Sequence, residues 1–173
     1  MAANWTPFVS GAVLTASQLN GVVDNFADMA IFNETQASGT FGGTFTSGSF
    51  IKRTLNTTVV NNIAGCSLSS SVITLPAGTF YVNAISPANN VNKQKTKLRN
   101  TTDSTDELIG NSNYGNADVG MPSIVVGVFT IAAPKNFELQ ARAGSTQTTY
   151  GLGEAASFSI SEVYSIIQIV RIA

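Results

Sequence analysis

The segment Glu162–Ala173, EVYSIIQIVRIA, constrains the fold of this chain more than any other. β-Branched residues dominate it, and apolar residues occupy both sets of alternate positions. A strand with one face in water would alternate more cleanly between apolar and polar residues, and Ile and Val are poor helix formers. The segment therefore predicts a strand that is buried on both faces. Ile124–Ile131, IVVGVFTI, has the same character, and we expect closely packed copies of the chain to supply the additional cover.

Short segments rich in β-branched and aromatic residues follow one another from Phe50 onward, with turn residues between them. We expect strands at Phe50–Leu55, Cys66–Ser69, Val72–Leu75, Thr79–Ser86, Asn92–Asn100, Asp106–Ile109, Ile124–Ile131, Asn136–Ala143, Ala155–Ile160 and Glu162–Ile172. The pattern gives no crossover helix after residue 33, which argues against a parallel α/β fold. The sequence therefore predicts an all-β jelly-roll β-sandwich over residues 50–173.

Residues 1–33 are expected to form an N-terminal docking arm and one short α-helix. The arm contains Trp5, Pro7 and Phe8 and is too short and too broken to pack alone. Large aromatic residues are common anchors at interfaces, so we interpret it as an extended arm that docks on another molecule. The alternative is that Trp5 folds back onto its own domain.

A helix is predicted over Thr15–Phe32, because Thr15 and Gln18 form a capping-box pattern. Four apolar residues follow with spacings of 3, 4 and 3, which is the rhythm of a coiled-coil seam: Leu19, Val22, Phe26 and Met29. This pattern favours a short parallel bundle of symmetry-related copies. An amphipathic helix that lies on its own β-domain, or on a neighbouring protein, is the alternative.

Residues 34–49, which begin ETQASGTFGG, are rich in Gly, Ser and Thr and have no periodicity beyond Phe41 and Phe45. This composition is typical of a linker or of a loose β-arm rather than of a domain. We therefore place the boundary of the β-domain at Phe50.

The composition limits the classes of function that the chain can have. Charged residues make up 11% of the chain, against about 25% in typical proteins, and the net charge is −1. Copies of such a chain repel one another little, which favours an oligomer. The chain has no histidine and one cysteine, Cys66, so His-based catalysis and thiol-rich metal sites are excluded. We expect a buried Cys66, no cofactor, no metal and no enzymatic activity.

Four cations alternate along one predicted strand and should project from the same face: Lys93, Lys95, Lys97 and Arg99. They could bind an anionic polysaccharide or an acidic protein, or simply guard an exposed strand against aggregation. Tyr114, in the predicted loop GNSNYGN, could stack on a sugar. No aromatic residue is interleaved among the cations, so we expect no nucleic-acid partner. No apolar run reaches the length of a transmembrane helix, so we expect no membrane insertion.

A resemblance to a known family rests on four segments. The opening WTPFVSGAVLTASQLN resembles the arm-and-helix start of small virion proteins of tailed bacteriophages. The segments VITLPAGTFYVNAISPANNVNKQKTKLRN, VFTIAAPKNFELQAR and EVYSIIQIVRI look like the C-terminal β-domain of phage fibre and appendage proteins, which is similar to the trimeric TNF/C1q-type jelly roll.

The resemblance implies a non-enzymatic homotrimer on the virion surface, made in the host cytoplasm and held by capsid or tail proteins. Trp5, Pro7 and Phe8 would dock on the particle. Three copies would be aligned by Leu19, Val22, Phe26 and Met29, and Ile167 and Ile169 would lie in the β-core or the trimer seam. With 173 residues there is no long shaft, which favours a head fibre, a capsid decoration or a short tail fibre or knob. The alternative is a carbohydrate-binding receptor-recognition module of a tail fibre, whose partner would be host-surface polysaccharide.

Overall fold

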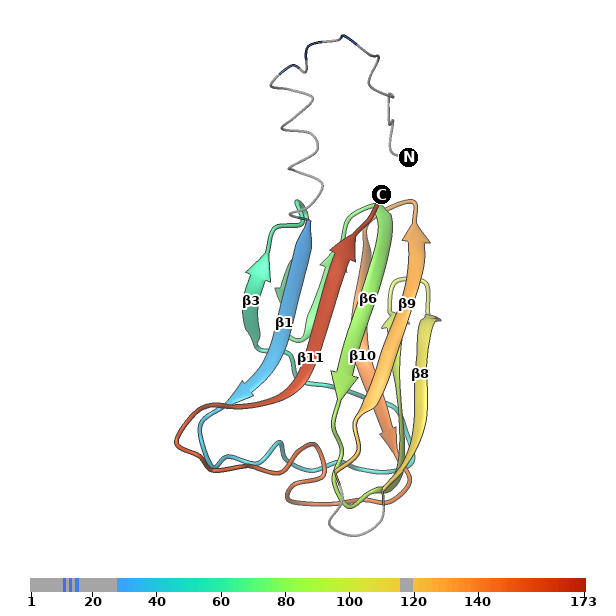
Figure 1. Cartoon of the computed structure of the whole chain (residues 1–173). Coiled ribbons are helices and arrows are strands. Elements are labelled where there is room, and N and C mark those ends of the chain that lie inside the picture. Colours follow the sequence, from blue (N-terminus) through green and yellow to red (C-terminus); the bar gives the residue numbers. More distant parts are fainter. Residues whose placement is uncertain (1–10, 12, 14, 16–27, 116–119) are drawn as a thin grey trace.

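The computed structural model describes residues 11, 13, 15, 28–115 and 120–173. In these residues two antiparallel sheets form a sandwich (Figure 1). One sheet has the order β3-β1-β11-β6-β9, and its strands are Thr57–Asn61, Met29–Gln36, Glu162–Arg171, Gly78–Ser86 and Ser123–Ile131. The other has the order β4-β5-β10-β7-β8, and its strands are Ser67–Ser69, Val72–Leu75, Lys135–Ala143, Asn92–Asn100 and Thr105–Gly115. The short strand β2, Ile51–Lys52, pairs with β10. The predicted all-β class is confirmed.

The core lies between the two sheets. Phe80 and Phe129 from the first sheet and Phe137 from the second form a chain of rings, with centroids 5.8 and 5.2 Å apart. Around them pack Phe32, Leu139 and Ile167, which are all fully buried, with many more apolar side chains. Burial of this apolar surface is the main favourable term for the sandwich.

The C-terminal strand β11 is central in its sheet, as predicted, between β1 and β6. Its burial within one chain is less complete than predicted. Ile167 and Ile169 point into the core and are 0% and 1% exposed, whereas Ile166 and Val170 on the other side are only half-buried. The same holds for β9, whose outward residues are exposed. The prediction that both faces of these strands are buried is therefore wrong for a single chain.

Strand β1 corrects the predicted end of the helix. Met29–Gln36 is a strand, although the apolar spacing predicts a helix that extends to Phe32 and includes Met29 in its seam. Its burial alternates, with Ala30 and Phe32 inward, because β1 pairs with β11 on one side and β3 on the other. Such pairing with distant segments overrides a local helical spacing.

The predicted linker also differs from the structure. Residues 34–36 belong to β1, and Phe45 is fully buried in a small second core with Ala141 and Val91. Phe45 forms a β-bridge with Gln147, so this segment packs along the loop that precedes β11. Glycine-rich composition indicated flexibility here, but backbone pairing and one buried ring fix the segment.

The remaining strands follow the predictions, with four differences. The strand predicted at Phe50–Leu55 is reduced to β2, Ile51–Lys52. β5 and β7 have the predicted bounds, whereas β3 was not predicted. β8 extends to Gly115, so the predicted loop that contains Tyr114 is strand. The predicted strand Ala155–Ile160 is absent from the structure. Ser157 and Ser159 there have φ of 59° and 63°, which a strand does not accommodate.

Candidate functional site

Three cross-strand rows of outward side chains cover the sheet that contains β1, β11, β6 and β9. The register places them as Met29, Val170, Tyr81 and Val128; then Ile31, Gln168, Asn83 and Val126; then Asn33, Ile166, Ile85 and Ile124. We call this surface the apolar face.

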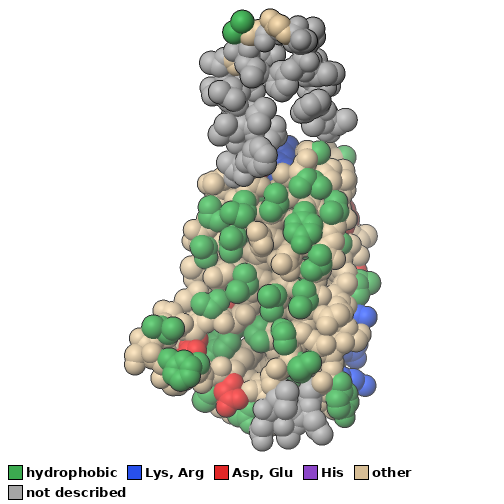
Figure 2. Space-filling view, viewed as in Figure 1, with side chains coloured by type: hydrophobic (Ala, Val, Ile, Leu, Met, Phe, Trp, Pro, Cys, Tyr) green, Lys and Arg blue, Asp and Glu red, His purple; other side chains and the backbone are tan. Residues whose placement is uncertain are grey.

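The apolar face is unusual for a surface in contact with water. None of its twelve residues is charged, and Ile124, Val126 and Val128 are 39%, 54% and 53% exposed. Figure 2 shows apolar side chains spread over this side of the molecule. Contiguous exposed apolar surface that lacks charge is typical of a protein–protein interface.

The outer face of the second sheet is polar and carries the predicted row of cations. The predicted alternation is confirmed, because Gln94, Thr96 and Leu98 point inward and the four cations outward. However, only two of the four cations, Lys97 and Arg99, have an ion-pair partner among the described residues. Asp106 pairs with both Lys97 and Arg99 at 2.8 Å, and Lys97 Nζ also lies 4.2 Å from the centre of the Phe50 ring.

The other two cations of the row, Lys93 and Lys95, lie near a third cation, Arg142, which the sequence pattern does not place beside them. Arg142 of β10 is directly opposite Lys95 in the register, and on the other side of β7 Tyr114 is opposite Lys93. All four side chains are exposed, and among the described residues neither lysine nor Arg142 has an ion-pair partner. Only the strand order β10-β7-β8 brings them together.

Two carboxylates of the acidic loop TTDSTDE, Asp103 and Asp106, form ion pairs with nearby cations. Asp103 Oδ1 lies 2.6 Å from Lys135 Nζ, and a hydrogen bond from Lys135 lowers the pKa of this carboxyl group. The pKa of Asp106 is lowered too, first by a hydrogen bond from Lys97. Among the described residues no group of three or more His, Cys, Asp and Glu side chains is arranged to hold a metal ion.

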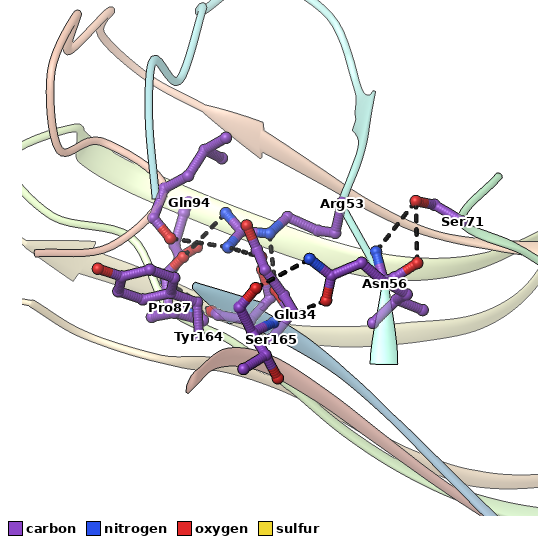
Figure 3. Close-up of polar contacts among 12 residues, drawn as sticks. Glu34, Arg53, Asn56, Ser71, Pro87, Gln94, Tyr164 and Ser165 are labelled. Atoms are coloured by element: carbon purple, nitrogen blue, oxygen red, sulfur yellow. Dashed lines mark hydrogen bonds and ion pairs between the residues drawn. The ribbon is translucent and has the colours of Figure 1, made fainter. Parts of the chain in front are cut away.

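Arg53, whose backbone N–H donates to the carbonyl of Leu139 in β10, forms a buried ion pair with Glu34 of β1 (Figure 3). Arg53 Nη2 donates to Glu34 Oε2 at 2.8 Å, and the two side chains are 0% and 1% exposed. Arg53 also donates to Ser165 Oγ at 2.7 Å and to the carbonyl oxygens of Leu152 and Pro87. Burial lowers the pKa of the guanidinium, and the Glu34 carboxylate opposes that shift. Arg53 thus links β1, β11 and two loops, a role that the sequence did not indicate.

Glu162 organises the loop before β11. Its carboxylate accepts hydrogen bonds from the backbone N–H groups of Gly39, Ser157 and Ala156 at 3.0, 2.9 and 3.1 Å. These bonds, with that of Gly39 first, lower the pKa of Glu162. The carboxylate therefore ties residues 37–40 to residues 155–158.

Replacement of Glu162 by glutamine should loosen both segments, because an amide oxygen cannot accept all three hydrogen bonds. We expect the amides of Gly39, Ala156 and Ser157 to exchange hydrogen roughly tenfold faster or more. Amide hydrogen exchange measures this, with Glu138→Gln as the control of equal charge. Unchanged exchange at all three amides would contradict the role of Glu162.

The same contacts make these segments sensitive to acid. Since the pKa of Glu162 in the folded protein is below its ordinary 4.5, the carboxylate's contribution is complete above about pH 4.5 and is lost as the pH falls through the lower folded value. Protection of the three amides should decline over that range in the wild-type protein and not in Glu162→Gln.

Several predicted residues lie outside the described part of the chain. These are the docking residues Trp5, Pro7 and Phe8 and the helical residues Leu19, Val22 and Phe26. Met29 is on the apolar face, whereas Ile167 and Ile169 lie in the core of one chain. Cys66 is buried, and desolvation raises the pKa of its thiol to about 11, which makes it a poor nucleophile at neutral pH. No helix among the described residues is long and apolar enough to cross a membrane.

Comparisons with known proteins identify the fold. No protein-family model and no curated protein sequence matches the chain. Among solved structures, the globular domain of the zebrafish complement 1qA protein is 11% identical, with a TM-score of 0.56 over 84% of this chain and 98% of that one. Murine APRIL at pH 5.0 is 7% identical, with a TM-score of 0.52 over 83% and 98% of the two chains.

A third similar structure is that of Eiger TNF from S. frugiperda. It is 13% identical, with a TM-score of 0.50 over 84% of this chain and 92% of that one. Identities this low show the fold alone. The chain therefore has a TNF/C1q-like jelly-roll fold, as predicted.

Proposed function

We propose that this protein is a non-enzymatic structural protein of a bacteriophage virion, a homotrimeric appendage on the particle surface. It is a head fibre, a capsid decoration or a short tail fibre or knob, held through its N-terminal residues by capsid or tail proteins. The proposal combines the resemblance of the sequence to phage virion proteins with the surfaces that the structure presents.

The apolar face supports the proposed homotrimer, because it is suited to contact between copies of the chain. Its two mostly apolar rows flank a row in which Gln168 and Asn83 are neighbours. Packing of three copies through this face would remove Val126 and Val128 from water, and the central amides could then bond across the contact. Apolar area and a shortage of charge are properties of permanent interfaces.

The direction of the chain supports attachment through the N-terminus. β1 begins at Met29, opposite Val170, close to the chain's C-terminal residue, whose carbonyl accepts from Thr79 N–H (Figure 1). The long loops, including residues 37–50 and 144–161, lie at the other end of the sandwich. A molecule anchored through residues 1–28 would present those loops outward.

Sedimentation equilibrium of the full-length protein tests the assembly. We expect a single species with three times the chain mass of 18.1 kDa. Immunogold labelling of purified phage particles tests the location, and label on the particle surface is the expected result. A monodisperse 18.1 kDa species would refute the trimer, and an antibody that labels no particle would refute the virion role.

The second candidate is a carbohydrate-binding receptor-recognition module. The observation that favours it is the group of exposed cations around Tyr114 on the polar sheet. The two functions are compatible, since a surface appendage can also contact the host.

A further inference from the structure

The outer face of the sheet β10-β7-β8 carries two kinds of cation, which differ in their partners. Among the described residues, Lys52, Lys97, Arg99 and Lys135 form ion pairs with Glu138, Asp106 and Asp103. Lys93, Lys95 and Arg142 form none. The cations at one end of this sheet therefore have carboxylate partners, with Lys97 and Arg99 sharing Asp106, whereas those at the other end have none among the described residues.

The register brings the unbalanced charges close together. Arg142 and Lys95 are direct cross-strand partners, so their Cβ atoms are about 5 Å apart. Lys93 is two residues further along the same face of β7, about 7 Å away. Like charges directly opposite each other destabilise a sheet, and a bound anion would remove that cost.

Two neighbouring groups shape the cluster. Tyr114 is opposite Lys93 on β8 and is 66% exposed. Gly144 lies under the stem of Lys93, because a Cβ atom at Gly144 would come within 2.6 Å of Lys93 Cγ. Three cations, the Tyr114 ring and Ser112, which is opposite Lys95, thus share one exposed surface.

We propose that Lys93, Lys95 and Arg142, with Tyr114 beside them, form a binding site for an acidic polysaccharide. Separated cations on an exposed face suit a chain that carries a carboxylate on successive sugars, and an exposed tyrosine ring can stack on a sugar face. Single-stranded nucleic acid fits less well, because its binders offer several aromatic rings for successive bases. A protein partner would need an apolar anchor, and Tyr114 is the one large ring at this cluster among the described residues.

The place of the cluster agrees with the proposed function, on which the biological meaning of this site rests. Lys93 is at the end of the sandwich where β6 stops, since Gln94 Nε2 contacts the carbonyl of Ser86 and Lys93 O accepts from Gly144 N–H. β1 begins at the other end, beside Tyr81. The apolar face is on the opposite sheet, so three joined copies would leave all three clusters exposed at the outward end.

Binding of the full-length protein to polygalacturonate tests the site, with dextran of the same length as the neutral probe and single-stranded DNA of matched charge as the competing polyanion. We expect affinity for polygalacturonate well above that for dextran and DNA, and a decrease with added salt. The triple variant K93Q/K95Q/R142Q should bind at least about tenfold more weakly, with a shallower dependence on salt. Tyr114→Ala should weaken binding about fivefold or more, whereas Tyr114→Phe should not.

The matched control is K52Q/R99Q/K135Q, which removes the same charge from cations that have partners on the same sheet. It should bind within about twofold of the wild type, because its cations are already paired with carboxylates. Equal losses in both triple variants, no preference over dextran, or tighter binding of DNA would each overturn the proposal. Sedimentation of the same samples separates the two hypotheses: a trimer that does not bind refutes this site alone, and a monomer that binds refutes the trimer alone.

Discussion

Replacing Arg53 by alanine should lower the free energy of unfolding by about 3–5 kcal/mol. The substitution leaves the Glu34 carboxylate, 1% exposed, with no cation beside it, and removes the donors to Ser165 and Leu152. An unpaired charge in the interior costs far more than the loss of an exposed ion pair. Denaturant unfolding at a fixed protein concentration measures the change, since assembly would make the stability depend on concentration.

The double variant R53M/E34L separates the value of the pair from the cost of breaking it. Both charges are then absent, and apolar side chains of similar length fill the space, so most of the lost stability should return. Lys52→Ala is the control, because its ion pair with Glu138 is on the surface and 3.6 Å long. A loss below about 1 kcal/mol for Arg53→Ala would contradict this role of the buried ion pair.

The strands that the sequence predicted well have a pattern that local residues set. β7 matches its predicted bounds because cations alternate with Gln94, Thr96 and Leu98, and turn-forming residues flank the strand at both ends. β11 was recognised from its β-branched residues. In both strands, the secondary-structure propensity of the residues agrees with their place in the sheet. Strands can be predicted from sequence when these two agree.

The failures have a common cause, which is that distant segments decide the local structure. β1 exists because β11 and β3 pair with it, more than 120 and about 30 residues away. The segment Ala155–Ile160 has strand-like residues, but Glu162 draws its backbone N–H groups into a turn. Neither contact leaves a periodic signal in the sequence.

The same reasoning applies to the surfaces. Alternation predicted correctly that four cations share one face of β7, but not that Lys97 and Arg99 share Asp106 as an ion-pair partner. Arg142 lies beside Lys95 only because β10 pairs with β7, which the sequence does not indicate. The apolar residues at both sets of alternate positions in β11 and β9 were predicted to be buried, but in a single chain the outward set remains exposed or half-buried.

Replacing Val126 by glutamate should convert the proposed trimer into monomers. Val126 is 54% exposed in a single chain and points away from the core, so the substitution should change the stability of one folded chain by less than about 1 kcal/mol. In the assembly the same position lies in the central row of the apolar face, opposite Asn83. Three carboxylates would be buried without partners, at several kcal/mol each.

Sedimentation equilibrium should therefore show the mass of one chain for Val126→Glu at concentrations where the wild type is trimeric, with an unchanged far-ultraviolet circular dichroism spectrum. Ile109→Glu is the matched control, because Ile109 is 63% exposed but lies on β8 in the other sheet. It introduces the same side chain and should stay trimeric. If Val126→Glu remained trimeric as well, the apolar face could not be the seam, and the contact between copies would have to lie elsewhere on the chain.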